Sequence, residues 1–338
     1  MHVSASIIPS FWTEPMAIKL TDLIAQVPRE VETKVQRVRD DARSTLQDAL
    51  RAECRLVMRT QEETEQRRQG AQVPVEVAAG HPLVLKNIEF PADIARILLL
   101  GRYRRPLEHA RDCIPQLLKL RDNLRGLPEP DKWAPTGASE LLLVGNWATQ
   151  LLKVLNEHDP LKKVLLVSED FLGVYEYDAR DLFEDQQAVN RASIKLYWGV
   201  IGLVSQWLGC AVEDLAIVVL THELAHAYTQ LGADIEGRRW AAPAFARAAT
   251  ALKEGLAQYY TDRVLNRLER RYPGALKVFL RMLPSQPDAY RSHLPWIKKS
   301  SPEAVRRAML EVRRRGEGKL EDFNKRLHVA QEDLGPQR

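Results

Sequence analysis

The segment from Ala211 to Leu231 constrains the fold of this chain more than any other. Most of its residues are apolar, it contains neither glycine nor proline, and Gly232 follows it. Glu213 and Asp214 near its start suit the positive end of a helix dipole. The segment therefore predicts a mostly buried helix. Two histidines and a glutamate lie within it, where polar groups without partners would be costly.

These polar residues form the motif HELAH at 222–226. Histidines four residues apart lie on the same face of a helix, so His222 and His226 can bind one metal ion. Glu223 is turned about 100° around the axis from His222, where its carboxylate can accept a proton from water without ligating the metal. A pair of core histidines with backbone or carboxylate partners is the alternative interpretation.

A catalytic zinc site usually takes three protein ligands and leaves a fourth position for water. Glu254 is the candidate for the third ligand, because it lies in the sequence LKEGLAQYY at 252–260, whose apolar residues indicate a helix that packs inward. A surface glutamate is the alternative. We therefore expect one Zn²⁺ per chain, bound by His222, His226 and Glu254.

The motif HELAH, followed after 27 residues by EGLAQYY, resembles the gluzincin branch of the zincin metallopeptidases. In that branch a glutamate from a second helix completes a site of two histidines and a glutamate. The resemblance covers roughly residues 164–262. It implies a zincin-like core that cleaves a peptide or protein substrate without an acyl-enzyme, with Glu223 as the general base. The sequence lacks the HExxHxxGxxH continuation of metzincins and the GAMEN motif of gluzincin aminopeptidases.

The resemblance also implies a donor that stabilises the developing oxyanion from a downstream segment. Tyr290 and His293 are the best placed by their order in the sequence, so we predict a catalytic role for them. Tyr228, Tyr259 and Tyr260 are rivals for this role.

Two further groups of residues are predicted on the same grounds. Some gluzincins carry an aspartate four residues after the glutamate ligand; Gln258 holds that position here, and Asp262 lies one turn later. Either one is expected to orient a ligand histidine. The strand-like sequence IKLYW resembles the edge strand of the zincin cleft, so Ile194, Leu196 and Trp198 are expected to bind an extended peptide by edge pairing.

A long stretch near the N-terminus, from about residue 29 to 69, predicts an amphipathic helix that Gly70 and Pro74 end. Its apolar stripe suits packing against another helix of this chain or against a partner protein. Three runs with strand character, at 164–169, 171–177 and 193–200, predict a small sheet.

We expect an α+β, mainly α fold in three regions. Residues 1–130 form a helical N-terminal region, residues 131–265 a zincin-like metallopeptidase core with a small mixed sheet, and residues 266–338 a helical C-terminal extension. The segment at 124–139, rich in proline and charge, is the candidate linker between the first two regions.

The composition narrows the environment and the partners of the chain. Three cysteines without CxxC spacing argue against a disulfide framework and against a thiolate zinc site. No apolar stretch approaches the roughly 20 residues that span a bilayer, and the N-terminus does not read as a secretory signal. A cytoplasmic protein without a membrane span is therefore expected. With 49 basic and 45 acidic residues, nucleic acid is an unlikely partner.

Three other functions remain open at this point. A zinc hydrolase acting on a non-peptide amide or ester would use the same ligands. A binding or scaffold protein with a structural zinc ion would need no general base, so Glu223 argues against it. A nucleic-acid-linked regulatory protease would use the basic clusters at Lys298, Lys299 and Arg313 to Arg315.

Overall fold

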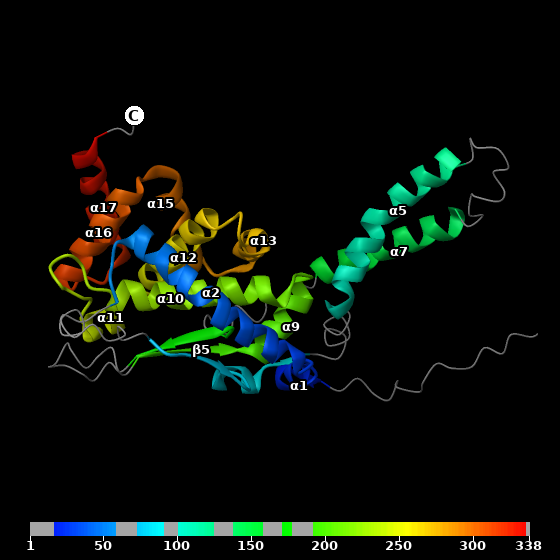
Figure 1. The fold of residues 1–338 in the computed structure, drawn as a ribbon, viewed down its shortest axis with the longest axis horizontal. Coiled ribbons are helices and arrows are strands. Elements are labelled where there is room, and N and C mark those ends of the chain that lie inside the picture. Colours follow the sequence, from blue (N-terminus) through cyan, green and yellow to red (C-terminus); the bar gives the residue numbers. More distant parts are fainter. Residues whose placement is uncertain are drawn as a thin grey trace, which may run out of the picture.

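Helix α10 (Val212–Leu231) lies at the centre of the main body of the computed structural model (Figure 1). The structure describes residues 17–58, 73–90, 101–124, 138–157, 171–177 and 192–335. Every residue of α10 from Leu215 onward is buried, as its apolar sequence predicts. A sheet covers one side of α10 and helices cover the other.

The sheet is small and mixed. Its three strands are β2 (Val75–Ala78), β4 (Gly173–Glu176) and β5 (Ser193–Tyr197), in the order β2-β5-β4. Strand β5 is parallel to β2 and antiparallel to β4. Two short strands, β1 (Ile18–Lys19) and β3 (Glu89–Phe90), pair separately. The described residues are thus mainly helical with a small mixed sheet, as expected, and the expected strand at 164–169 lies outside them.

The strand expected at 193–200 ends early, because helix α9 (Trp198–Leu208) begins at its third-last residue. A helix at this place packs closely against α1 (Leu20–Ala25) and the start of α2. A Cβ atom added to Gly202 would lie 2.5 Å from Cγ1 of Val27, so only glycine permits this approach. Tertiary packing therefore overrides the strand preference of this sequence.

Helix α2 (Glu30–Cys54) forms the predicted amphipathic helix, and its apolar stripe is buried against α9, α10, α12 and β2. Of the two alternatives, packing within the chain is therefore the one observed, and this stripe is not available to a partner protein. The helix stops at Cys54 because Arg55 adopts a left-handed conformation and Val57 pairs with Ala233. The prediction that it continues through residues 55–58 is wrong, and 59–69 lie outside the described residues.

The C-terminal part of the chain is helical and covers the remaining face of α10. One hydrophobic core joins residues from Leu20 to Ala330, so all three predicted regions contribute to it. Its C-terminal elements are α11 (Ala242–Arg247), α12 (Thr250–Arg267), α13 (Pro273–Met282), η4 (Leu283–Ser285), α14 (Asp288–Arg291), α15 (Leu294–Lys299), α16 (Pro302–Arg315) and α17 (Leu320–Leu334).

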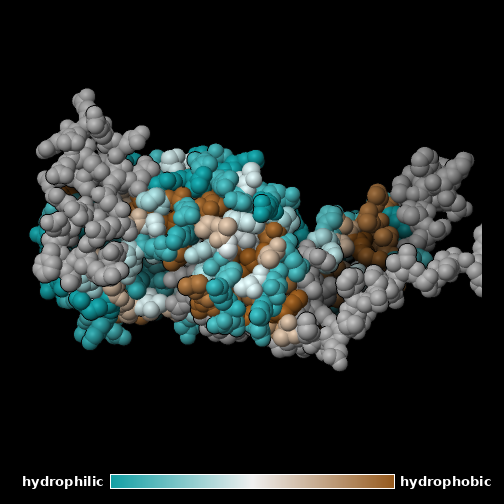
Figure 2. Space-filling view, turned by 90° about the horizontal axis from the view of Figure 1, so that it is seen from below, coloured by the Kyte–Doolittle hydropathy of each residue, from teal (hydrophilic) through white to brown (hydrophobic). Residues whose placement is uncertain are grey.

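A hairpin of two helices, α5 (Arg104–Leu124) and α7 (Ala138–Glu157), extends away from the main body (Figure 1). It has a small core of its own, and Figure 2 shows apolar side chains on its surface. Exposed apolar residues of the hairpin are Leu117, Leu120, Leu142, Leu143, Val144 and Trp147. Most of the predicted linker between these two helices lies outside the described residues. The short helices η1 (Leu83–Asn87) and η2 (Gly101–Tyr103) precede the hairpin.

Two findings bear on the predicted partners. Within the described ranges, no helix combines the length and the apolar character that crossing a bilayer requires. In the basic run near the end of α16, Arg313 is buried, and the carboxylate of Glu311 pairs with both Arg314 and Arg315. One of the three positive charges is therefore removed from the surface and a second is balanced, which weakens this run as a site for a nucleic acid.

Arg313 ties α16 to the segment that follows α10. Its guanidinium donates hydrogen bonds to the backbone carbonyl oxygens of Gly232 and Arg238, the second at 3.2 Å. Burial lowers the pKa of Arg313 to about 10, so the side chain is still charged at neutral pH. A positive charge at this place also favours the C-terminal end of the α10 dipole.

We predict that Arg313→Ala lowers the free energy of unfolding by about 2 to 4 kcal/mol, because the buried carbonyl group of Gly232 and the partly buried one of Arg238 lose a charged donor. Urea denaturation followed by circular dichroism measures this change. Arg314→Ala, at the exposed neighbouring position, is the matched control and should cost less than about 0.5 kcal/mol. Equal midpoints for the two variants would contradict the anchoring role of Arg313.

Candidate metal centre

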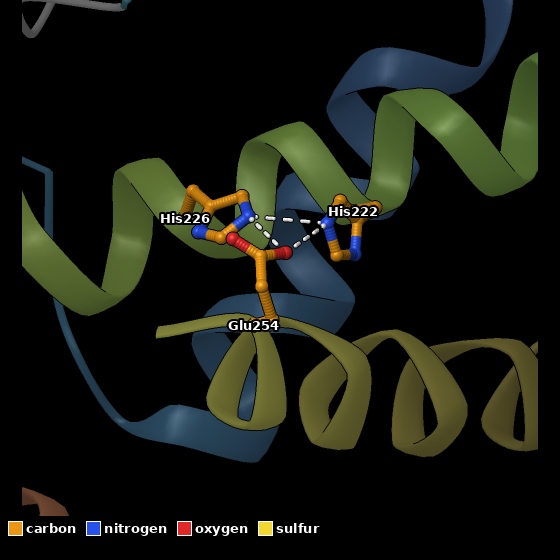
Figure 3. Close-up of side chains that lie close together, drawn as sticks. All are labelled: His222, His226 and Glu254. Carbon is orange, nitrogen blue, oxygen red and sulfur yellow. Dashed lines mark hydrogen bonds and ion pairs between the residues drawn. The ribbon is translucent and has the colours of Figure 1, made fainter. Parts of the chain in front are cut away.

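Three predicted side chains converge between α10 and α12 (Figure 3). His222 and His226 lie on the same face of α10, and Glu254 reaches them from the first half of α12. The two Nε2 atoms are 3.1 Å apart, and Oε2 of Glu254 is 3.2 Å from each of them. All three residues are buried. The structure thus brings together two residues that are neighbours on one helix and a third that lies far along the chain.

The spacing of these atoms suits a tetrahedral metal ion. Zinc binds histidine nitrogen and carboxylate oxygen at about 2.0–2.1 Å, so two of its tetrahedral ligands are about 3.3 Å apart. The three measured separations of 3.1–3.2 Å are close to this value. A set of two imidazoles and one carboxylate also matches the ligands that catalytic zinc prefers. The group can therefore hold a metal ion, and among the described residues it supplies three of the four tetrahedral ligands.

Glu254 is ionised in spite of its burial. Burial by itself raises the pKa of its carboxyl group, but the charges and hydrogen bonds of His226 and His222 outweigh it and hold the pKa well below its usual range. A carboxylate within an apolar core requires such partners. Glu254 is therefore ready to accept a cation without first losing a proton.

His222, His226 and Glu254 are called the metal-ligand group below. Glu223 lies beside this group and against strand β4. It is buried, and its side chain closely approaches Gly173. A Cβ atom added to Gly173 would lie 3.1 Å from both Cγ and Oε1 of Glu223, and 2.8 Å from Cγ1 of Val219. The glycine therefore lets the backbone of β4 pass directly over this carboxylate.

Two tyrosines flank the histidine pair. The ring of Tyr290, on α14, stacks on His222 with the centroids 5.7 Å apart. The ring of Tyr175, on β4, lies parallel to His226 with the centroids 6.5 Å apart. Of the two, Tyr290 was predicted from its order in the sequence. Tyr175 was missed, although it belongs to a run whose strand character is evident.

The structure turns His293, the other predicted catalytic residue, toward a backbone carbonyl group. This side chain is fully buried, and its Nδ1 lies 2.7 Å from the carbonyl oxygen of Tyr290. A carbonyl oxygen only accepts, so Nδ1 carries the proton and Nε2 is left as an acceptor. Burial lowers the pKa of His293 to about 4, so the ring is neutral at neutral pH. In this state His293 has no donor to offer to an oxyanion.

The contacts of the rival tyrosines lie outside the group of His222, His226 and Glu254. The hydroxyl group of Tyr228 donates to the carbonyl oxygen of Gln47, at 3.2 Å. Tyr259 and Tyr260 contact each other, with their ring centroids 5.3 Å apart. Burial raises the pKa of Tyr259 to about 12, and the charges of Arg263 on α12 and Glu53 on α2 also act on its hydroxyl group. These three side chains therefore face α2 and the outer part of α12 rather than the metal-ligand group.

Neither residue expected to orient a ligand histidine bonds to one. The amide of Gln258 donates to Oε1 of Gln286, at 3.4 Å. Asp262 accepts a 2.7 Å hydrogen bond from Asn266. The expectation was made without knowing where these side chains point. Asn266 lies one turn after Asp262 on the same helix and is a nearer partner for Asp262 than a histidine of α10.

The predicted substrate strand is also corrected. Strand β5 lies between β2 and β4, so its backbone has no free edge for a peptide. Ile194 and Leu196 are completely buried, and Trp198 belongs to α9. Among the described strands, the one at the edge of the sheet beside the site is β4. The sequence FLGVYEY at 171–177 predicted this strand, but its order in the sheet is a property of the fold.

A small cavity of about 40 Å³ adjoins the group. It extends from His222 and Glu223 along α10 and α12 toward η4. Its lining includes Phe171, Gly173, Val219, Gln258, Met282 and Gln286. Space therefore exists next to the carboxylate that is expected to act as a base.

Comparison with protein-family models, with curated protein sequences and with solved structures returns no match. Inferences about the activity therefore depend on the geometry of the site and on its motif.

We predict that the purified chain binds one zinc ion and that Glu254→Ala weakens its zinc affinity by more than about 100-fold, because losing only an outer partner of a ligand costs about 10- to 100-fold. Competition with a chromogenic chelator measures the affinity, and elemental mass spectrometry the stoichiometry. Glu223→Gln is the matched control, since this neighbouring side chain is not a ligand. Wild-type affinity in Glu254→Ala would remove Glu254 from the ligand set.

Proposed function

We propose that this chain is a zinc-dependent metallopeptidase that hydrolyses peptide bonds with Glu223 as the general base. The observation that carries this proposal is the triangle of ligand atoms with edges of 3.1–3.2 Å, next to a buried carboxylate that is not part of it. A purely structural zinc site needs four ligands and no base. The combination of three ligands and an adjacent carboxylate favours hydrolysis over a scaffold role.

His222, His226 and Glu254 would hold the ion. Bound zinc acts as a Lewis acid toward a carbonyl group and makes water more acidic. Glu223 accepts a proton from the attacking water and passes it to the leaving amine, so no residue of the chain forms a covalent bond with the substrate.

Strand β4 offers a place for an extended substrate. A peptide that paired with the outer edge of β4 would pass close to Glu223, because Gly173 brings the strand backbone to within contact of that side chain. Main-chain hydrogen bonds to an edge strand align a peptide whatever its side chains are. The same alignment would present one peptide bond to the metal centre.

Tyr290 is the best-placed donor for the developing oxyanion. It is buried, it stacks on a ligand histidine, and it lines the cavity beside Glu223. A phenolic hydroxyl group can donate a hydrogen bond without carrying a charge of its own.

We expect the zinc-loaded chain to cleave members of a proteome-derived peptide library, and Glu223→Gln to lower kcat by at least about 100-fold, the usual lower range for loss of a general base. Mass spectrometry of the products measures this. Zinc content must stay at the wild-type level in the variant. Cleavage of amide or ester dyes without any cleaved peptide would replace the proposal with a non-peptide hydrolase, and unchanged cleavage in Glu223→Gln would exclude this base.

We also predict that Gly173→Ala lowers kcat/KM by up to about 100-fold while zinc binding is retained, because the added methyl group crowds Val219 and Glu223 so that one of them or β4 must shift, and a misplacement of about 1 Å has an effect of this size. The matched control is Val174→Ala, which shortens the next side chain of the strand, on its opposite face. Equal losses in the two variants would show that β4 matters only for folding.

A further inference from the structure

The cavity beside the metal-ligand group has a polar side formed by Gln258. This residue lies on α12, one turn after Glu254, and it is 3% exposed. Its Nε2 donates to Gln286, whereas its Oε1 is buried without a hydrogen-bond partner among the described residues. When a buried amide has a hydrogen-bond partner at just one of its two ends, the other end indicates a place for a ligand or a water molecule.

The remainder of the cavity limits what can enter it. Phe171, Val219 and Met282 form an apolar part of its lining, and each of them is buried. A volume of about 40 Å³ accommodates about three water-sized groups, since one such group needs about 10–15 Å³. Threonine and valine side chains each have three non-hydrogen atoms, whereas lysine, arginine and aromatic side chains are too large.

The free end of the amide distinguishes between side chains of this size. A hydroxyl group donates and accepts, so it satisfies Gln258 whichever way the amide is turned. A methyl group in the same place leaves the amide unsatisfied. A site that bonds to a substrate hydroxyl rejects an isosteric side chain without one much more strongly than an apolar pocket discriminates by size.

We propose that this cavity is a specificity pocket for threonine or serine at a position flanking the scissile bond, with Gln258 as the residue that selects the hydroxyl group. The inference rests on the proposed peptidase function, because Glu223 and His222 line the same cavity and place its occupant next to the reacting bond. The substrate class is therefore peptides with a small hydroxyl-bearing residue at the cleavage site.

The test uses the full zinc-loaded chain and a proteome-derived peptide library, with the cleaved positions identified by mass spectrometry. Two peptides that differ only by threonine or valine at the preferred flanking position are then compared by kcat/KM. We expect the wild type to favour threonine by at least about 10-fold, as for other sites that bond to a substrate hydroxyl. In Gln258→Met, which has a similar volume and no amide, the ratio should fall close to one.

Gln230→Met is the matched control. Gln230 is also a buried glutamine whose Oε1 has no partner among the described residues, but it does not line the cavity. This variant should keep the wild-type ratio.

A wild-type ratio near one, with peptides cleaved, would overturn the pocket and leave the peptidase function intact. A wild-type preference that persists in Gln258→Met would remove Gln258 as the selecting residue. If no peptide is cleaved, the proposed function fails and this inference fails with it. The wild-type comparison needs no variant, so it is decisive even if Gln258→Met does not fold.

Discussion

Burial of α10 is the constraint on which the rest of this structure depends. A helix that is apolar on nearly every side must be covered on every side. Strands β4 and β5 cover one side of α10, and helices α2, α12 and α13 cover others. This arrangement removes water from two histidines and two glutamates, so each charge must find a partner. Glu254 meets both histidines, and the same packing that completes the core therefore assembles the candidate metal centre.

The short strand β4 is the part of the sheet that lies next to the candidate metal centre and to Glu223. Gly173 allows its backbone to approach Glu223, and Tyr175, two residues later on the same face, lies against His226. One strand thus lies beside both the expected base and a histidine of the candidate metal centre. Positioning of this kind matters because proton transfer requires the base and the reacting groups to lie within hydrogen-bond reach. The hairpin of α5 and α7 extends away from this region and has a core of its own.

Local sequence patterns predicted the helices that are determined by their own residues. The helix at 212–231 follows from its apolar residues and from the absence of glycine and proline, and the helix that carries Glu254 follows from the apolar residues around that glutamate. The failures occurred where distant contacts decide. Helix α2 stops at Cys54 because Val57 pairs with Ala233, far along the chain, and Trp198 starts a helix because Gly202 packs against Val27. Neither contact leaves a signal in its neighbouring residues.

The sequence by itself determined the pair of histidines and the glutamate between them, because a spacing of four residues places two side chains on one helix face in any fold. It also indicated Glu254, through the apolar residues around it. Only the tertiary structure decided that Oε2 of Glu254 lies 3.2 Å from both imidazoles, that β4 rather than β5 is the strand at the sheet edge, and that His293 is turned toward a backbone carbonyl. These properties join residues that are distant in the sequence, and the packing of whole helices and strands sets their distances.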